Sequence, residues 1–162
     1  MKRLHGILAV AAFAFGSASA QVVTPDGKGC PPPPKDLVTR DIVKGEGEVV
    51  AFRTAVTVGY TGWVYDGCAK DFKGEKFDSS DGRATPFGLV VGAGRVIKGW
   101  DEGLIGMQKD GKRLLVIPAD KAYGARSPTP KIPPNSALVF EVTLGSIISS
   151  PPVEPGVTVK KP

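Results

Sequence analysis

The sequence predicts an α+β fold in which a twisted antiparallel sheet of about five strands, a half-barrel, wraps around one short helix. Two observations lead to this prediction. Apolar residues recur at every second position in several segments between residues 36 and 148, as they do in strands with one buried face. Only one segment shows the spacing of three and four that is typical of a helix.

The alternation is clearest in three segments of the chain. Its apolar positions are Val56, Val58, Tyr60, Leu115, Ile117, Leu138, Phe140, Val142 and Leu144. The residues expected on the opposite face are polar: Thr57, Thr61, Arg113, Glu141 and Thr143. A polar face indicates an antiparallel sheet that is open to solvent on one side. Asp66-Gly67 is a turn signal after the first of these strands.

The helical segment extends from Val96 to Met107. Its apolar positions are Val96, Ile97, Trp100, Leu104 and Met107. Glycines at positions 99, 103 and 106 weaken the helix in isolation, so we expect packing against the sheet to stabilise it. A helix that closes the concave face of the sheet would leave a shallow apolar pocket.

The first twenty residues have the pattern of a secretory signal peptide. Basic Lys2 and Arg3 precede an apolar run over residues 7–15, and small residues follow up to Ala20. We expect cleavage between Ala20 and Gln21. The apolar run is shorter than the roughly 20 residues that span a bilayer, so we expect no membrane anchor. Export is therefore predicted, to the periplasm or, as the alternative, to the external medium.

Composition divides the exported chain into three parts. Residues 21–35 include four consecutive prolines and predict an extended arm. Residues 149–162 are again rich in proline and predict a disordered tail. The folded domain is expected over residues 36–148. The exported chain of about 140 residues is enough for one domain with a single core.

Charge and residue usage exclude several classes of function. Lys2 and Arg3 account for two of the formal +5 charges, and the remaining basic residues are scattered among acidic ones, so we expect no nucleic-acid partner. His5, the only histidine, leaves with the signal peptide. The exported chain therefore has neither a histidine-dependent triad nor a histidine metal site, and we expect no metal and no cofactor.

Two cysteines, Cys30 and Cys68, enter an oxidising compartment after export. A pair of cysteines in such a compartment is usually bridged, so we expect a disulfide. Free thiols are the alternative, because the sequence does not show how close the two α-carbons lie.

Six segments match one family in order and spacing. They are GYTG at 59–62, KFDSS at 76–80, PF at 86–87, VIKGWDEG at 96–103, AYGA at 122–125 and IPPNSALVF at 132–140. Together they resemble the FKBP-type peptidyl-prolyl cis/trans isomerases, over a span from Ile42 to Ile147. The resemblance implies the same half-barrel fold and an enzyme that speeds isomerisation of the X-Pro bond.

The resemblance also implies roles for particular residues. Asp78 and Tyr123 would be catalytic, with Asp78 near Tyr60 and Arg83 and with the Tyr123 hydroxyl donating to the bound peptide. The Ile97 backbone N–H would hold a substrate carbonyl. Trp100 would form the pocket floor, and the substrate-binding walls would be Tyr60, Phe77, Phe87, Val96, Ile97, Ile132 and Phe140. Periodicity alone would instead place Trp100, Phe87 and Phe140 in the core.

Two departures from the family pattern concern the surroundings of the pocket. Residues 68–74 form an insertion between the Asp66-Gly67 turn and Phe77, and a bridge from Cys68 to Cys30 would pin this loop to the arm. Residues 126–131 replace a loop that is usually richer in glycine and apolar residues. Lys131 stands there in place of an apolar residue near the rim.

By resemblance, the partners are proline-containing unfolded or partly folded polypeptides, and macrolide inhibitors are further candidate ligands. A short arm in place of a long helical N-terminal region predicts a monomer. Two other functions stay open from sequence. One is a holdase-type chaperone that uses the same pocket without turnover, and the other is attachment to a partner through the proline-rich ends.

Overall fold

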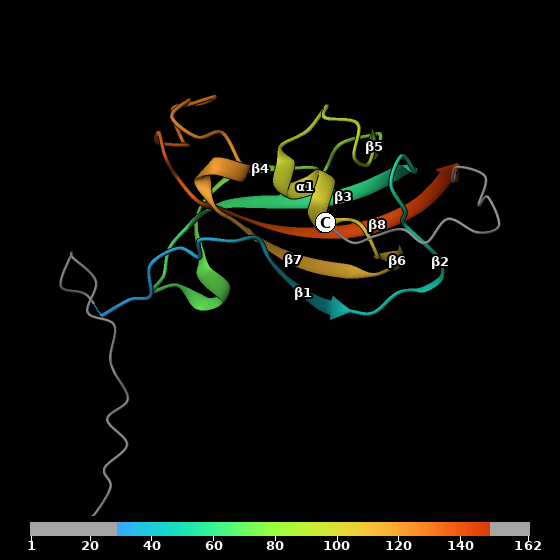
Figure 1. Cartoon of the computed structure of the whole chain (residues 1–162), viewed down its shortest axis with the longest axis horizontal. Helices are drawn as coiled ribbons and strands as arrows, with labels where there is room; N and C mark the ends of the chain where they lie inside the picture. Colours follow the sequence, from blue (N-terminus) through green and yellow to red (C-terminus); the bar gives the residue numbers. More distant parts are fainter. Residues whose placement is uncertain (1–28, 150–162) are drawn as a thin grey trace, which may run out of the picture.

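The computed structural model describes residues 29–149, which form a six-stranded antiparallel sheet with one α-helix on one face (Figure 1). The strands of this sheet are β1 (Val38–Val43), β3 (Ala55–Tyr65), β4 (Lys73–Ser79), β5 (Phe87–Val90), β7 (Lys112–Ile117) and β8 (Leu138–Ser149). A separate ribbon pairs β2 (Glu46–Val49) with β6 (Gln108–Lys109). The α+β prediction is confirmed, with six strands where about five were expected.

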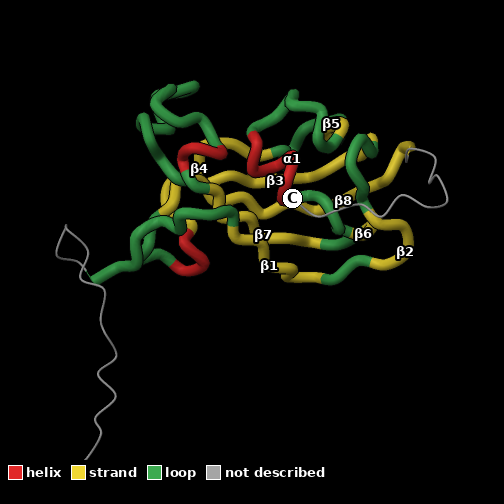
Figure 2. Tube along the Cα trace, in the orientation of Figure 1, coloured by secondary structure: helices red, strands yellow, loops and turns green. Residues whose placement is uncertain are grey.

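Strand β3 pairs with three other strands of the sheet. The order is β1-β7-β8-β3-β4, and β5 also pairs with β3. Strand β8 follows β3 from Ala55 to Val64, whereas β5 pairs with the first part of β3 and β4 with the second. Because every pairing is antiparallel, the sheet needs no helical crossovers, and helical segments are short compared with the strands (Figure 2).

Helix α1 (Lys98–Gly103) is held against β7 by two glycines. A Cβ atom at Gly99 would overlap the side chain of Ile117, and one at Gly103 would lie 2.8 Å from Leu115 Cδ2. Their spacing of four places both glycines on one side of the helix. The glycines that weaken the isolated helix thus allow its close approach to the sheet.

The helix is shorter than the predicted segment from Val96 to Met107. Ile97 has an extended backbone, with ψ at 145°, so the helix begins at Lys98. Val96 and Ile97 belong to the preceding loop, and Met107 lies beyond the last turn. All of these side chains still pack in or against the main core.

The main core lies between the sheet and α1. Its buried residues include the predicted alternating positions Val56, Val58, Leu115, Ile117, Leu138, Val142 and Leu144, together with Trp100, Leu104 and Met107. The period-two pattern therefore identified the buried face of these strands correctly.

The opposite face of the sheet is not uniformly polar, which corrects the prediction. Leu114, Val116 and Val139 are buried there in a second apolar cluster. Trp63, Tyr65 and Phe72 pack on it. Phe72 belongs to a 3₁₀ turn (Lys70–Phe72) inside the insertion, and its ring stacks on that of Tyr65 at 5.3 Å. The inserted loop thus covers part of a face that was expected to be open to water.

Arg113 is a second correction. It was expected on the solvated face, but it has the same parity as Leu115 and Ile117 and is only 9% exposed. Its guanidinium donates from Nη1 to the carbonyl oxygens of Gly103, at 2.8 Å, and Ile105, at 3.0 Å. It also forms a two-point ion pair with Asp41 of β1. One buried cation therefore connects the edge strand, β7 and the end of α1.

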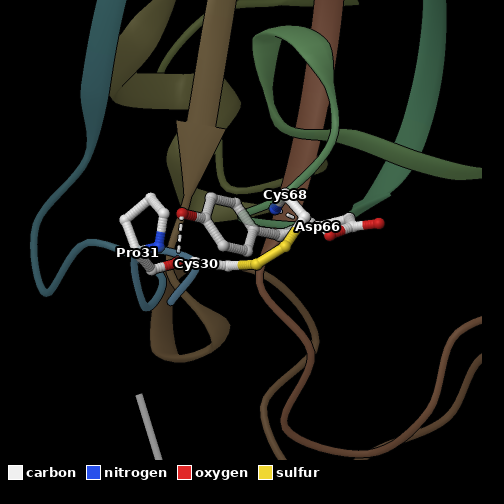
Figure 3. The surroundings of a disulfide bond; sticks show 5 residues. Cys30, Pro31, Asp66 and Cys68 are labelled. Carbon is white, nitrogen blue, oxygen red and sulfur yellow. Dashed lines mark hydrogen bonds between the residues drawn. A yellow bond between two sulfur atoms is a disulfide. The ribbon is translucent and has the colours of Figure 1, made fainter. Parts of the chain in front are cut away.

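A disulfide joins Cys30 to Cys68, with the two α-carbons 5.0 Å apart, which confirms the predicted bridge. Figure 3 shows Cys30 and Pro31 of the arm beside Asp66 and Cys68 of the inserted loop. The Tyr65 hydroxyl donates to the carbonyl oxygens of Pro31 and Pro32 at 3.0 and 3.1 Å. The described part of the arm is therefore tied to the inserted loop by a covalent bond and to the end of β3 by hydrogen bonds.

Several predictions concern residues outside 29–149. These are the signal peptide at 1–20 with cleavage between Ala20 and Gln21, the beginning of the arm, and the tail beyond Ser149. Between residues 29 and 149, no helix has the length and apolar character needed to cross a membrane.

Candidate active site

A cavity of about 540 Å³ opens beside α1 on the helix side of the sheet. Strands β3, β4, β5 and β8, helix α1 with the loop before it, and the loop after the 3₁₀ turn Ala119–Lys121 supply its lining. The lining residues are Tyr60, Phe77, Asp78, Phe87, Gly94, Arg95, Val96, Ile97, Lys98, Trp100, Ala122, Tyr123, Arg126 and Phe140. Nine of the ten predicted site residues are thus brought together.

Trp100 lies at the base of the cavity and is 4% exposed. Three rings meet it nearly at right angles: Tyr60 at 5.2 Å, Phe87 at 6.0 Å and Phe140 at 5.3 Å between centroids. Edge-to-face packing of this kind is the favoured geometry of aromatic pairs. The four rings support one another and form a rigid apolar surface.

The aromatic wall depends on the absence of a side chain at Gly62. A Cβ atom there would lie 2.7 Å from Phe140 Cε1 and 2.7 Å from Phe77 Cζ. These two rings pack edge to face at 5.5 Å. Glycine on β3 therefore provides the space in which Phe77 and Phe140 meet.

Asp78 is held at the cavity by three donors. The Tyr60 hydroxyl donates to its Oδ2 at 2.6 Å, and the Arg83 guanidinium and the Ser79 N–H donate to its Oδ1 at 2.7 and 2.8 Å. The Arg83 guanidinium also lies over the Tyr60 ring, 5.7 Å from its centroid. These contacts fix the orientation of both Asp78 and Tyr60.

The two cavity tyrosines are neutral donors over the physiological pH range. Burial, and then the hydrogen bond to Asp78, raise the pKa of Tyr60 to about 12. Burial, followed by the negative charge of Asp78, raises the pKa of Tyr123 above its usual value. Both effects arise because a phenolate would be poorly hydrated and close to a carboxylate.

Asp101 organises the loop that leads into α1. Its carboxylate accepts hydrogen bonds from the backbone N–H groups of Gly92, at 2.7 Å, and Gly94, at 2.8 Å. The Ile97 carbonyl accepts from the N–H groups of Trp100 and Asp101 at the start of the helix. Within residues 29–149, no group accepts a hydrogen bond from the Ile97 N–H. A fixed backbone donor is therefore available beside the cavity.

Tyr123 stands on a loop with its own backbone bonds. The Gly124 N–H donates to Ala119 O at 2.8 Å, and Gly124 O accepts from the Asn135 N–H at 2.7 Å. Among the described residues, none accepts a hydrogen bond from the Tyr123 hydroxyl. This hydroxyl is thus a second donor available to a molecule in the cavity.

Ile132 is the predicted wall residue that does not line the cavity. It is 2% exposed and lies in the main core. Lys131, predicted near the rim, is exposed but does not line the cavity either.

Sequence reasoning missed three lining cations, Arg95, Lys98 and Arg126. Arg95 and Lys98 flank Val96-Ile97, and Arg126 follows Tyr123 by three residues. This closeness to predicted site residues was the signal that could have identified them.

Across residues 29–149, no cluster of three histidine, cysteine, aspartate or glutamate residues could hold a metal ion. The cavity offers aromatic surface, one anchored carboxylate, backbone and hydroxyl donors, and cations at its edge. Its chemical means are therefore shape, desolvation and hydrogen bonding.

Comparison with known proteins gives a consistent result. The family model described as "FKBP-type peptidyl-prolyl cis-trans isomerase" matches residues 47–145. An "FK506-binding protein" of Neisseria meningitidis is 44% identical over 108 residues, which cover 67% of this chain and 93% of the relative. An "FK506-binding protein" of Streptomyces anulatus is 41% identical over 116 residues, covering 71% and 89%.

Two solved structures resemble the fold. The crystal structure of FkpA from Escherichia coli superposes with a TM-score of 0.57 and 39% identity, and the match covers 68% of this chain but 47% of FkpA. The crystal structure of AtFKBP13 superposes with a TM-score of 0.58 and 32% identity, covering 77% of this chain and 96% of AtFKBP13.

Proposed function

Because the chain belongs to the FKBP-type peptidyl-prolyl cis-trans isomerase family and is thus a peptidyl-prolyl isomerase, we propose that it assists the folding of exported proteins through its aromatic cavity. Its substrates are unfolded or partly folded polypeptides that contain proline. The observation that carries this proposal is the cavity itself, where an aromatic base at Trp100 lies beside two available donors, the Ile97 N–H and the Tyr123 hydroxyl.

The reaction sets the demands on the site. Rotation about the X-Pro amide must overcome a barrier of about 18–20 kcal/mol that comes from C–N double-bond character. No covalent bond is formed or broken, so neither a nucleophile nor a proton relay is needed. The site has only to bind the twisted amide more tightly than the planar one. A thousandfold acceleration requires about 4 kcal/mol of this preference.

The cavity supplies that preference in two ways. The planar amide is the more polarised form and is better stabilised by water, so an apolar enclosure disfavours it relative to the twisted form. The rings of Trp100, Tyr60, Phe87 and Phe140 provide this enclosure around a proline ring. In the proposal, Phe77 and Val96 complete the walls.

The two donors orient the peptide around the bond that turns. The Ile97 N–H binds a carbonyl of the substrate, and the Tyr123 hydroxyl binds the peptide on the side of the 119–124 loop. Asp78 keeps Tyr60 in place and contributes the only carboxylate among the described residues that line the cavity. Asp78 and Tyr123 are therefore the proposed catalytic residues. Ile132 supports the wall from the core.

Export accounts for the ends of the chain and for the bridge. We assign residues 1–20 to a signal peptide, 21–35 to an arm, 36–148 to the isomerase domain and 149–162 to a tail. The Cys30–Cys68 disulfide supports an oxidising compartment, since such bridges persist outside the cytoplasm. The periplasm is the proposed location, because exported proteins can fold there and X-Pro isomerisation is slow enough to limit folding.

Two further properties belong to the proposal. FK506-type macrolides are expected to bind the cavity and inhibit the enzyme. The reason is that this chain matches most of the length of relatives that are named FK506-binding proteins. The isomerase is expected to work as a monomer, which light scattering of the purified exported form would test by mass.

The test is an isomerase assay on residues 21–162 with proline peptides. We expect Tyr123→Phe and Asp78→Ala each to lower kcat/KM by about tenfold, as the loss of one hydrogen bond in a desolvated site implies. Tyr65→Phe is the matched control, because Tyr65 bonds to the arm and not to the cavity. The proposal would be refuted if the wild-type protein gave no acceleration, or if the variant that combines Tyr123→Phe with Asp78→Ala kept full activity.

A further inference from the structure

Three cations at the edge of the cavity form no ion pair with the described part of the chain. Arg95, Lys98 and Arg126 line the cavity and are exposed. Six ion pairs occur between side chains of residues 29–149, and none of them includes these three residues. Their charges are therefore directed at solvent or at whatever enters the cavity.

Acidic groups near the cavity are already engaged elsewhere. Asp78 accepts from Tyr60, Arg83 and Ser79, and its charge is paired with that of Arg83. Asp101 accepts from two backbone N–H groups of the 92–94 loop, and Glu102 pairs with Lys121. The rim thus keeps a positive excess that its own carboxylates do not cancel.

The cations also stand next to both proposed substrate contacts. Arg95 and Lys98 lie on either side of Val96-Ile97, whose backbone N–H is the available donor. Arg126 belongs to the turn that follows Tyr123, because its N–H donates to Tyr123 O at 3.1 Å. The carboxylate of Asp101 fixes the loop that carries Arg95. A peptide held by the Ile97 N–H and the Tyr123 hydroxyl would lie beside the two chain segments that carry the three cations.

We propose that this rim makes the enzyme selective for X-Pro segments with an aspartate or glutamate directly before or directly after the proline. The inference rests on the proposed function, since it assumes that the peptide lies in this cavity. Arg95, Lys98 and Arg126 act as specificity-determining residues. They attract the carboxylate, and the aromatic base accepts the proline ring.

The expected size of the effect is modest and depends on salt. Exposed ion pairs are individually weak, so three cations together should raise kcat/KM for a glutamate peptide by about three- to tenfold over its glutamine counterpart. At an ionic strength of about 1 M the Debye length falls to about 3 Å, and the preference should largely disappear. A preference for the glutamate peptide that is equal at low and at high ionic strength would point to shape and not to charge.

The experiment compares two matched peptide pairs, Glu-Pro with Gln-Pro and Pro-Glu with Pro-Gln, in one otherwise neutral sequence. Isomerisation is followed by NMR exchange without a coupling protease, and Kd is measured with the same peptides. The glutamate-to-glutamine ratio is determined for the wild type, for the triple variant R95Q/K98Q/R126Q and for Lys44→Gln. Lys44 is an exposed lysine that does not line this cavity.

We expect a ratio of about three to ten in at least one pair for the wild type and Lys44→Gln, and a ratio near one for the triple variant. If the wild type turns over both glutamine peptides but its glutamate-to-glutamine ratio is near one in both pairs, this inference is overturned and the proposed function is not. Binding without turnover would refute the proposed function, and the Kd ratio would then decide the inference. No binding of any peptide would overturn both.

Discussion

The Tyr60 hydroxyl donates to Asp78 Oδ2 over 2.6 Å, and this bond joins strand β3 to β4 at the edge of the cavity. It couples the ionisation of the tyrosine to a carboxylate that also holds Arg83. A change at Tyr60 therefore alters the wall and removes one donor from Asp78, whereas a change at Asp78 alters the charge of the site and releases the Tyr60 hydroxyl.

The first prediction concerns the effect of alkaline pH on stability. The folded-state pKa of Tyr60, about 12, exceeds the ordinary value of 10.0, so folding favours the protonated phenol. This contribution is complete below pH 10 and is lost as pH rises toward 12. Denaturant unfolding between these values should show a free energy of unfolding that falls with pH. The fall should be less steep in Tyr60→Phe, and an identical slope in both proteins would contradict the assignment.

A methyl group at Gly62 should damage the aromatic wall. Gly62→Ala places a Cβ atom 2.7 Å from both Phe77 and Phe140, so one ring must move. Overpacking of this kind costs about 1–3 kcal/mol of stability. We also expect kcat/KM to fall, because the displaced rings no longer fit the proline. Gly88→Ala on β5 is the control, since no described residue beyond its chain neighbours would lie within 4 Å of a Cβ atom there. Equal losses in the two variants would exclude a specific role of position 62.

Removal of the Arg113 guanidinium should destabilise the whole domain. Arg113→Met leaves the carbonyls of Gly103 and Ile105 without their donor and breaks the pair with Asp41. The expected loss is about 2–3 kcal/mol, measured by denaturant unfolding, because the group is buried and makes several bonds. Arg40→Met removes an exposed ion pair and should leave the midpoint almost unchanged. Equal midpoints for the two variants would show that Arg113 does not connect these elements.

Reduction of the disulfide should lower stability without a matching loss of activity. The bridge closes a segment with a separation of 38 residues, for which the chain-entropy model gives about 3–4 kcal/mol. Cys30 and Cys68 are both absent from the cavity lining. The double variant C30S/C68S should therefore unfold at lower denaturant while kcat/KM at 25 °C changes little. A parallel collapse of activity in well-folded protein would place the bridge in the catalytic machinery.

The sequence predicted most of the buried face, because strand residues alternate with a fixed period of two. Val56, Leu115 and Leu138 are buried as that period requires. The error at Arg113 came from treating charge as evidence of exposure, although its parity placed it with Leu115. A buried guanidinium needs several acceptors from separate parts of the chain, and that convergence is visible only in three dimensions.

The opposite face and the rim were harder to predict for a related reason. Whether Val116 and Val139 are covered depends on the position of the inserted loop, which the disulfide and the bonds to Tyr65 determine. The length of the helix was overestimated, because the spacing of side chains does not reveal the extended backbone at Ile97. Family motifs indicated the aromatic residues, whereas the cations between those motifs required the geometry of the cavity.

The contact between α1 and β7 has a consequence for how this protein can change. Gly99 and Ile117, and likewise Gly103 and Leu115, share one fixed volume. A larger residue at position 99 is thus compatible with the fold only when position 117 becomes smaller. Gly99→Ala and Ile117→Ala are each expected to be unfavourable, yet together they should partly compensate, because the alanine at 117 removes the γ and δ carbons that a Cβ at position 99 would overlap. A double-mutant cycle would measure this compensation as coupling. Engineering of the helix that carries Trp100 therefore has to change each helix position together with the strand position that it contacts.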